Sequence, residues 1–243
     1  MTGWNSQGRR AGRWAAFAAA LWLAAACGGG AQPGPVDLLV TGGRVIDPES
    51  GLDAVADVAV RDGVIVSVGD GQPEAREVLD ATGLVVAPGF VDLHAHGQDP
   101  VSQRYQARDG VTTAMELEIG VYPVDTWHAQ REGRALINYG ATVSHQGARR
   151  EAFGAVQTER NDEGTFTLGR GGAYLYEEAT EEELRRVARL MQAGLDQGAL
   201  GFGFGISYTP GASHEEIWRL FAAAAERGAP VFIHLRSAAR SRA

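Results

Sequence analysis

The sequence predicts an α/β protein with a small N-terminal β-sandwich over residues 37–87 and an incomplete (β/α)8 TIM barrel over residues 88–243. Short β-prone runs separated by turn residues fill the first region. Beyond Pro88, apolar strand segments alternate with amphipathic helix patterns, as in βα units around a parallel sheet. About five such strands are visible, whereas a closed barrel needs eight, so the barrel is predicted to be incomplete.

The composition is that of a folded, acidic chain. Of the 243 residues, 44% are hydrophobic, which is enough to build a packed core, and the formal net charge is −8. A nucleic-acid interface would be basic, so this charge argues against a nucleic-acid partner. The sequence contains no Lys, which excludes any chemistry that needs a lysine side chain.

Residues 1–27 have the pattern of a lipoprotein signal peptide. Three arginines precede an apolar run, Trp14–Ala26, which has the length of a signal-peptide core and is shorter than the roughly 20 residues of a spanning helix. The run ends at Cys27, the only cysteine, and resembles a lipobox except that Leu23 stands four residues before the cysteine. We therefore expect export, lipidation of Cys27 and attachment to a membrane surface on the periplasmic or extracellular face of the cell envelope. An ordinary secretory peptide is the alternative, and residues 28–36 are predicted to be a flexible tether.

The β-domain is predicted from four short runs rich in valine and isoleucine. Turn signals at Thr41-Gly-Gly43, Asp47–Gly51 and Arg61-Asp-Gly63 separate them, and the last predicts a tight hairpin because glycine accepts a positive φ. The runs are Leu38–Val40, Arg44–Ile46, Asp57–Val60 and Val64–Val68.

The barrel region is predicted to contain five strands and two well-marked helices. Capping-box patterns, Thr180 with Glu183 and Ser213 with Glu216, mark the starts of the two helices. The segment 150–179 is polar and glycine-rich, which predicts a long loop. The predicted strands are Leu84–His94, Gly110–Glu118, Asn138–His145, Gly201–Ile206 and Val231–His234.

The segment Asp92-Leu-His94-Ala-His96 is the sharpest chemical feature. Residues two apart on a strand face the same side, so the two imidazoles project together, with Asp92 deeper on that face. Two imidazoles at the C-terminal end of a barrel strand suit a divalent metal such as zinc. Asp92 is a candidate for a further ligand or for a group behind the ligands. The alternative is two surface histidines without a ligand.

Several motifs resemble one enzyme family. The segment Val86–His96 after a β-domain is similar to the entry of the metal-dependent amidohydrolase superfamily, and Asp109–Thr113 is similar to its second-strand motif. The segments Gly198–Gly211 and Val231–Arg236 resemble the D-aminoacylase and N-acyl-D-glutamate deacylase branch. The resemblance covers about residues 37–237 and corresponds to the N-terminal part of that family.

The resemblance implies a centre for one or two metal ions, with zinc expected. His94 and His96 would hold the first ion and His234 the second. The family bridges the ions with a carboxylated lysine or, in this branch, with a cysteine near the end of strand 2, and neither is present here. Glu116 and Glu118 stand on one face of that strand; we favour Glu118 as the bridge, with Glu116 second or behind the ligands. A carboxylate pair neutralised by arginine is the alternative, because unpaired buried carboxylates are costly.

Candidate substrate contacts follow strands 3, 4 and 5. Tyr208 and Arg236 are candidates for binding a substrate carboxylate, Arg236 by a bidentate pair. His145 is a candidate for orienting the substrate or for supporting other side chains. His128 and His214 lie on or next to predicted helices and are predicted to be solvated.

The activity implied is hydrolysis of a linear amide C–N bond, most of all deacylation of a small N-acyl-D-amino acid such as N-acyl-D-glutamate. The family's general base, an aspartate on strand 8, and a metal histidine on strand 6 cannot be assigned, so the catalytic base is unknown; a truncated form is expected, and both an active and an inactive chain are left open. Alternatives are a non-catalytic envelope lipoprotein that binds a metal or peptide, and a cyclic-amide hydrolase, against which the absence of lysine counts. Oligomeric state is not predicted.

Overall fold

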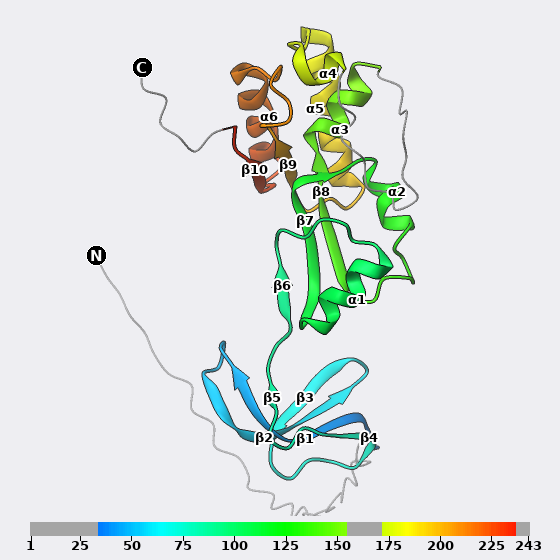
Figure 1. Ribbon diagram of the computed structural model, residues 1–243, viewed down its shortest axis with the longest axis vertical. Coiled ribbons are helices and arrows are strands. Elements are labelled where there is room, and N and C mark those ends of the chain that lie inside the picture. The colour runs from blue at the N-terminus through cyan, green and yellow to red at the C-terminus, as the bar shows by residue number, and fades with distance from the viewer. Residues whose placement is uncertain (1–33, 155–171, 237–243) are drawn as a thin grey trace, which may run out of the picture. The chain divides into compact units, whose positions relative to one another are not determined.

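The computed structural model describes residues 34–154 and 172–236. The chain divides into two compact units, Met1–Val86 and Ala87–Ala243 (Figure 1). Cys27 and the predicted signal peptide lie outside the described residues. Among the described helices, none combines the length and the apolar character that crossing a membrane requires.

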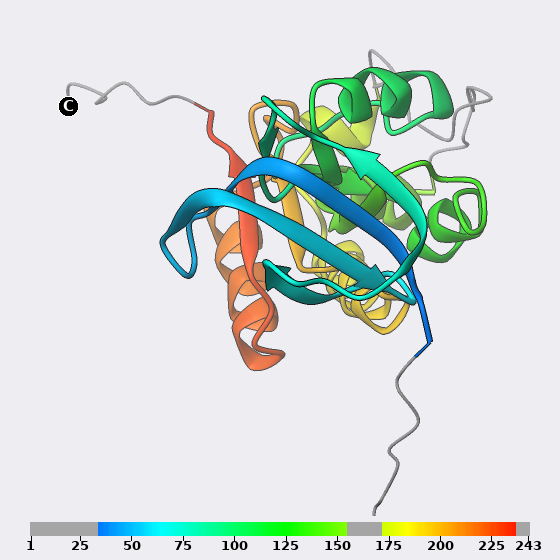
Figure 2. The same cartoon turned by 90° about the horizontal axis from the view of Figure 1, so that it is seen from below.

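The N-terminal unit is a mixed sheet of five strands in the order β3-β2-β1-β4, with β5 beside β1. The view from below in Figure 2 shows β1 and β2 running side by side as curved, antiparallel strands. Residues 34–86 form this one layer, so they do not supply the second layer that a sandwich needs. The strands are β1 (Val36–Asp47), β2 (Leu52–Arg61), β3 (Val64–Gly69), β4 (Ala75–Asp80) and β5 (Val85–Val86).

Two turn predictions in this unit had different outcomes. The hairpin between β2 and β3 is confirmed, because Asp62 and Gly63 take φ values of 51° and 75° in a two-residue turn. The predicted break at Thr41–Gly43 is wrong, because β1 runs through it with a bulge. Gly42 takes φ 69°, and its N–H donates to Asp57 Oδ1 at 2.9 Å, so the irregular residue is paired within the sheet.

The C-terminal unit contains a parallel sheet of five strands in the order β10-β9-β8-β7-β6. Spatial order follows chain order, which is the arrangement of successive βα units in part of a barrel, and the predicted fold class is confirmed. The edge strand β6 exposes Phe90 and Val91. The strands are β6 (Phe90–Asp92), β7 (Val111–Val121), β8 (Asn138–Ser144), β9 (Phe202–Gly205) and β10 (Val231–His234).

Helices connect these strands, and α3, α5 and α6 pack on β8 and β9 (Figure 1). The predicted loop 150–179 is partly helical, because α3 and α4 occupy its two ends; residues 155–171 lie outside the described part. The helices are α1 (Pro100–Arg108), α2 (Val124–Ala129), α3 (His145–Ala152), α4 (Ala173–Tyr176), α5 (Glu181–Asp196) and α6 (His214–Glu226).

The two predicted capping boxes differ in the structure. At α5, Thr180 and Glu183 form the full reciprocal box. At α6, Ser213 Oγ accepts from the N–H of Glu216 at 3.2 Å, but the Glu216 carboxylate turns inward to His145 and Arg149. A buried guanidinium binds a carboxylate more strongly than one backbone N–H does, so the second box is incomplete.

The core of this unit lies between the sheet and its helices. Val143, Phe202 and Phe204 are fully buried under Val187 and Leu220 of α5 and α6. Helix α5 approaches β8 so closely that a Cβ at position 194, which is glycine, would lie 2.5 Å from a methyl group of Val143. This packing holds the C-terminal ends of the strands, where the predicted site residues stand.

Candidate metal centre

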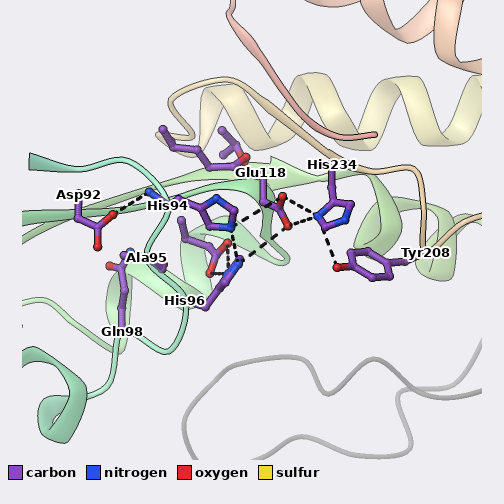
Figure 3. A network of polar contacts seen from close by, with 11 residues as sticks. Asp92, His94, Ala95, His96, Gln98, Glu118, Tyr208 and His234 are labelled. Carbon is purple, nitrogen blue, oxygen red and sulfur yellow. Dashed lines mark hydrogen bonds and ion pairs between the residues drawn. The ribbon is translucent and has the colours of Figure 1, made fainter. Parts of the chain in front are cut away.

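The ends of β6, β7 and β10 bring four of the predicted metal ligands together (Figure 3). His94 and His96 follow β6, Glu118 lies on β7 and His234 ends β10. Ligand atoms of His94, His96 and Glu118 all lie within 4.8 Å of one another. Residues separated by up to 140 positions therefore meet because parallel strands end at the same edge of the sheet.

The two imidazoles of the His-x-His motif face each other. His94 Nε2 lies 3.0 Å from His96 Nε2, and each of these nitrogens is 3.9 Å from a carboxylate oxygen of Glu118. Two ligand atoms on one tetrahedral zinc ion, each at about 2.0–2.1 Å, lie roughly 3.3 Å apart. Unprotonated ring nitrogens at 3.0 Å repel each other unless a proton or a cation lies beside them. The donor set and its spacing therefore fit a divalent metal ion.

Glu116 stands behind His96. Two oxygens of its carboxylate lie 2.8 and 2.9 Å from His96 Nδ1, which leaves Nε2 of the same ring directed at the cluster. Burial raises the pKa of Glu116, and His96 beside it acts in the opposite direction. A carboxylate that fixes the far nitrogen of a histidine is the usual support of metal-binding imidazoles. This contact favours a supporting role for Glu116, which is one of its two predicted roles.

Glu118 lies between the His-x-His pair and His234, as Figure 3 shows. Its carboxylate oxygens are 2.9 and 3.1 Å from His234 Nδ1 and face both imidazoles of the pair. The Tyr208 hydroxyl is 3.5 Å from the same His234 nitrogen, and the two rings are 4.9 Å apart. The Glu118 carboxylate thus faces the His94–His96 pair on one side and His234 on the other.

Asp92 supports the backbone at this site. Its Oδ1 accepts from the N–H of His94 at 3.0 Å, and its carboxylate is not part of the close group formed by His94, His96 and Glu118. Between the two predicted roles, the structure places Asp92 behind the ligands.

Known proteins that resemble this chain over most of its length include deacylases. The chain is 29% identical over 216 residues to the N-acyl-D-glutamate deacylase of Alcaligenes xylosoxydans xylosoxydans, covering 83% of this chain and 44% of that protein. The N-acyl-D-glutamate deacylase of Bordetella bronchiseptica, solved with zinc and a phosphonate that mimics the tetrahedral intermediate, matches with a TM-score of 0.67 and 28% identity over 84% of this chain and 46% of that one. A crystal structure of D-aminoacylase matches with a TM-score of 0.65 and 26% identity over the same shares.

Over most of its length the chain resembles the D-aminoacylase-like branch of the amidohydrolase superfamily in sequence and in fold.

The chain spans less than half the length of the deacylases it matches. The dihydroorotase of Citrifermentans bemidjiense is 49% identical over 67 residues, which is 27% of this chain and 16% of that protein. No family model matches the sequence.

Arg236 is bound to backbone carbonyls of the chain itself, and its predicted role as a substrate ligand stays a prediction. Its Nε donates to the carbonyl of Ile206 at 3.2 Å, and its Nη2 donates to the carbonyls of Thr209 and Ala212 at 3.1 and 2.6 Å. These bonds fasten the segment 206–212 to the end of β10. Tyr208 belongs to this segment, so Arg236 holds the tyrosine near His234.

His145 is fully buried, so the structure favours its supporting role over substrate contact. Its Nε2 lies 2.7 Å from a Glu216 oxygen, and Glu216 also pairs with Arg149. Arg149 further donates to the carbonyls of Tyr174 and Glu177, both at 2.7 Å. Burial lowers the pKa of His145. Burial alone would raise the pKa of Glu216, but His145 and Arg149 together hold it below its ordinary value.

Sequence reasoning missed Arg149 and Glu216, and it misplaced His128. The prediction that His128 is a solvated surface residue is wrong, because its ring packs 5.1 Å from Trp127 and 5.9 Å from Tyr139 and its Nε2 is buried. The capping-box spacing of Glu216 was visible in the sequence, but it predicted a bond to the helix start at Ser213 instead of contacts with His145 and Arg149.

Proposed function

We propose that this cluster holds one or two divalent metal ions, zinc first among them, and hydrolyses the amide bond of a small N-acyl-D-amino acid. The observation that carries the proposal is the meeting of His94, His96 and Glu118 at the ends of two barrel strands, with His234 beside them. The deacylases that this chain resembles support the same chemistry.

The ligand set favours a borderline cation. Imidazole nitrogens with a carboxylate oxygen are typical zinc ligands. We propose that His94 and His96 hold one ion, that His234 holds a second, and that Glu118 is shared between them in place of a cysteine or lysine. When bound, such an ion supplies the charge that acidifies a water molecule and polarises an amide carbonyl.

The chain's own residues supply orientation. Glu116 fixes the ring of His96 from behind, and Asp92 fixes the backbone before His94. The Tyr208 hydroxyl stands beside His234, from where it can donate to a substrate oxygen. A general base is not assigned among the described residues.

N-acyl-D-glutamate is the first substrate to test, because two of the similar proteins are N-acyl-D-glutamate deacylases. The chain would be saturated with zinc, and release of D-glutamate from N-acetyl-D-glutamate would be measured against the L-isomer. We expect zinc-dependent release that is stereospecific and absent in a His94→Asn variant. Zinc binding without hydrolysis of any N-acyl-D-amino acid would overturn the hydrolase proposal for this chain and favour a binding protein.

We also propose export and a lipid anchor at Cys27, which the sequence pattern alone supports. In a bacterial host the chain is expected in the membrane fraction, and a Cys27→Ser variant is expected to leave it. Equal distribution of both forms would rule the anchor out.

A further inference from the structure

A hollow of about 310 Å³ lies between the start of α1 and the turn that follows α2. Its lining includes Gln98, Asp99, Gln103, Arg131 and Arg134, and none of these residues belongs to the metal cluster. The volume is at the lower end of the range found for small-molecule sites.

Arg131 is a buried cation that no described carboxylate contacts at ion-pair distance, although Asp99 and Glu116 act on it from farther away. Only 6% of the residue is exposed, and no carboxylate forms an ion pair with it within residues 34–154 and 172–236. Its Nη1 donates to the carbonyl of Trp127 at 3.0 Å, and the guanidinium lies 4.1 Å above the indole ring. Burial lowers the pKa of Arg131 to about 10, so the side chain is still charged at neutral pH. A buried charge without a paired opposite charge is costly.

Nε of Arg131 is buried without a hydrogen-bond partner among the described residues, and it forms one edge of the guanidinium together with Nη2. This edge is one of the two forks with which a guanidinium binds both oxygens of a carboxylate. The protein therefore uses Nη1 to fix the side chain and leaves Nε on the recognition edge unsatisfied.

Two glutamines in the same lining also have unsatisfied atoms. Gln103, 1% exposed, accepts from the N–H of Leu136 at 2.9 Å through Oε1, but its Nε2 has no partner in the described structure. Gln98, 4% exposed, donates to the carbonyl of Ala95 at 3.4 Å, but its Oε1 has none there. Buried polar atoms are nearly always paired, so three such groups around one hollow indicate a missing polar partner.

The charges of the lining favour an anion. Asp99 is already engaged as the N-cap of α1, where its carboxylate accepts from the N–H groups of Val101 and Ser102 and from the Ser102 hydroxyl. Arg134 stands exposed at the rim. Two cations therefore face one carboxylate whose hydrogen bonds are satisfied.

We propose that this hollow binds a small carboxylate that also carries an O–H or N–H donor. The carboxylate takes the Nε–Nη2 edge of Arg131 and the amide Nε2 of Gln103, and the donor reaches Oε1 of Gln98. The site is separate from the metal cluster, so it does not depend on the proposed hydrolase activity.

Thermal unfolding of the full chain tests the proposal, with glycolate as the probe and sodium chloride at equal ionic strength and pH as the reference. A ligand that binds only the folded chain raises Tm with the logarithm of its concentration. We expect a rise of roughly 3–6 °C when glycolate reaches ten times its Kd. No rise beyond chloride, or an equal rise with sulfate or phosphate, would overturn the assignment of a carboxylate site.

A matched pair of substitutions on α1 separates specific binding from a general salt effect. Gln103→Glu keeps the acceptor for Leu136 N–H and replaces the unpaired amide nitrogen with a negatively charged oxygen. Gln106→Glu makes the same change on the same helix outside the hollow. We expect the glycolate shift to disappear in Gln103→Glu and in Arg131→Met and to persist in Gln106→Glu. A shift of wild-type size in Gln103→Glu would contradict the proposal.

Discussion

Two histidine–glutamate clusters lie in the C-terminal unit, and they differ in exposure. In the metal-type cluster, the side chains of His94, His96 and His234 are 61%, 47% and 40% exposed. In the buried cluster, His145 and Glu216 are 0% and 1% exposed. The same residue types therefore form one exposed and one buried cluster, and the two environments suit different roles.

The buried cluster contains an arginine that pairs with its glutamate, whereas the exposed cluster has no such arginine among the described residues. Arg149 pairs with Glu216, so the buried charges are matched by the protein. Among the described residues, no arginine forms an ion pair with Glu116 or Glu118, and their close partners are histidines. This exposed cluster of imidazoles and carboxylates therefore has a donor set that could hold a metal ion.

The largest effect is expected when the buried cluster loses its cation. Arg149→Met leaves Glu216 buried without its charge partner, and we expect a loss of about 3–5 kcal/mol in the free energy of unfolding, measured with urea. The control is Arg186→Met, which breaks an exposed pair with Glu151 and should cost less than about 1 kcal/mol. Equal losses in the two variants would show that the buried cluster is not a structural support.

The next largest effect is expected on zinc affinity when the Glu116 carboxylate behind His96 loses its charge. Glu116→Gln removes the charge that fixes the imidazole, and we expect zinc affinity to fall by about 10–100-fold. The matched change Glu216→Gln in the buried cluster should leave the zinc affinity of the folded chain unaltered. Competition with a zinc-sensitive dye measures both, and an unchanged affinity in Glu116→Gln would remove Glu116 from the centre.

Arg236 connects the exposed cluster to its neighbouring loop, and its loss should affect that loop alone. Hydrogen bonds from a charged donor contribute about 1.5–3 kcal/mol each when buried and less when solvated. With Arg236→Met we expect amide hydrogen exchange in residues 206–212 to become at least about tenfold faster. Arg227→Met, which breaks an exposed pair with Asp196, is the control, and unchanged exchange in Arg236→Met would refute the fastening role.

The smallest effect is a dependence of stability on pH. Burial lowers the pKa of His145, so the unfolded chain, with the ordinary value of 6.5, binds a proton that the folded chain does not. Stability is therefore complete above about pH 6.5 and falls as the pH drops through the lowered pKa. The lowered pKa of Glu216 acts in the same direction at more acidic pH. The urea midpoint should fall less steeply between pH 8 and pH 5 in His145→Gln than in the wild type; identical slopes would assign the effect elsewhere.

Local spacing made much of the molecule predictable. His94 and His96 come together as their two-residue spacing predicted, although both follow the end of β6, and the capping box at Thr180 marks the start of α5. The glycine of the β2–β3 hairpin has the positive φ that its turn requires. Each of these features depends on neighbours within a few residues, which a sequence pattern contains.

Long-range partners made the remainder unpredictable. Glu216 has capping-box spacing to Ser213, but its carboxylate binds residues 67 and 71 positions away. Arg236 follows the predicted ligand His234, and this position suggested contact with a substrate. In the structure, its guanidinium donates to carbonyl groups 24 to 30 residues earlier. Near and distant groups compete for the same charged side chain, and tertiary packing decides between them. A rule based on neighbouring residues does not include the distant groups.

Zinc binding by equilibrium dialysis, with metal analysis of the protein, tests the central claim most directly. The claim is that the exposed cluster accepts a cation and the buried cluster does not. We predict at least one zinc ion per wild-type chain, loss of that ion in His94→Asn, and unchanged binding in His145→Gln. A wild-type chain without zinc, or a His94→Asn variant that binds as much as the wild type, would contradict the account.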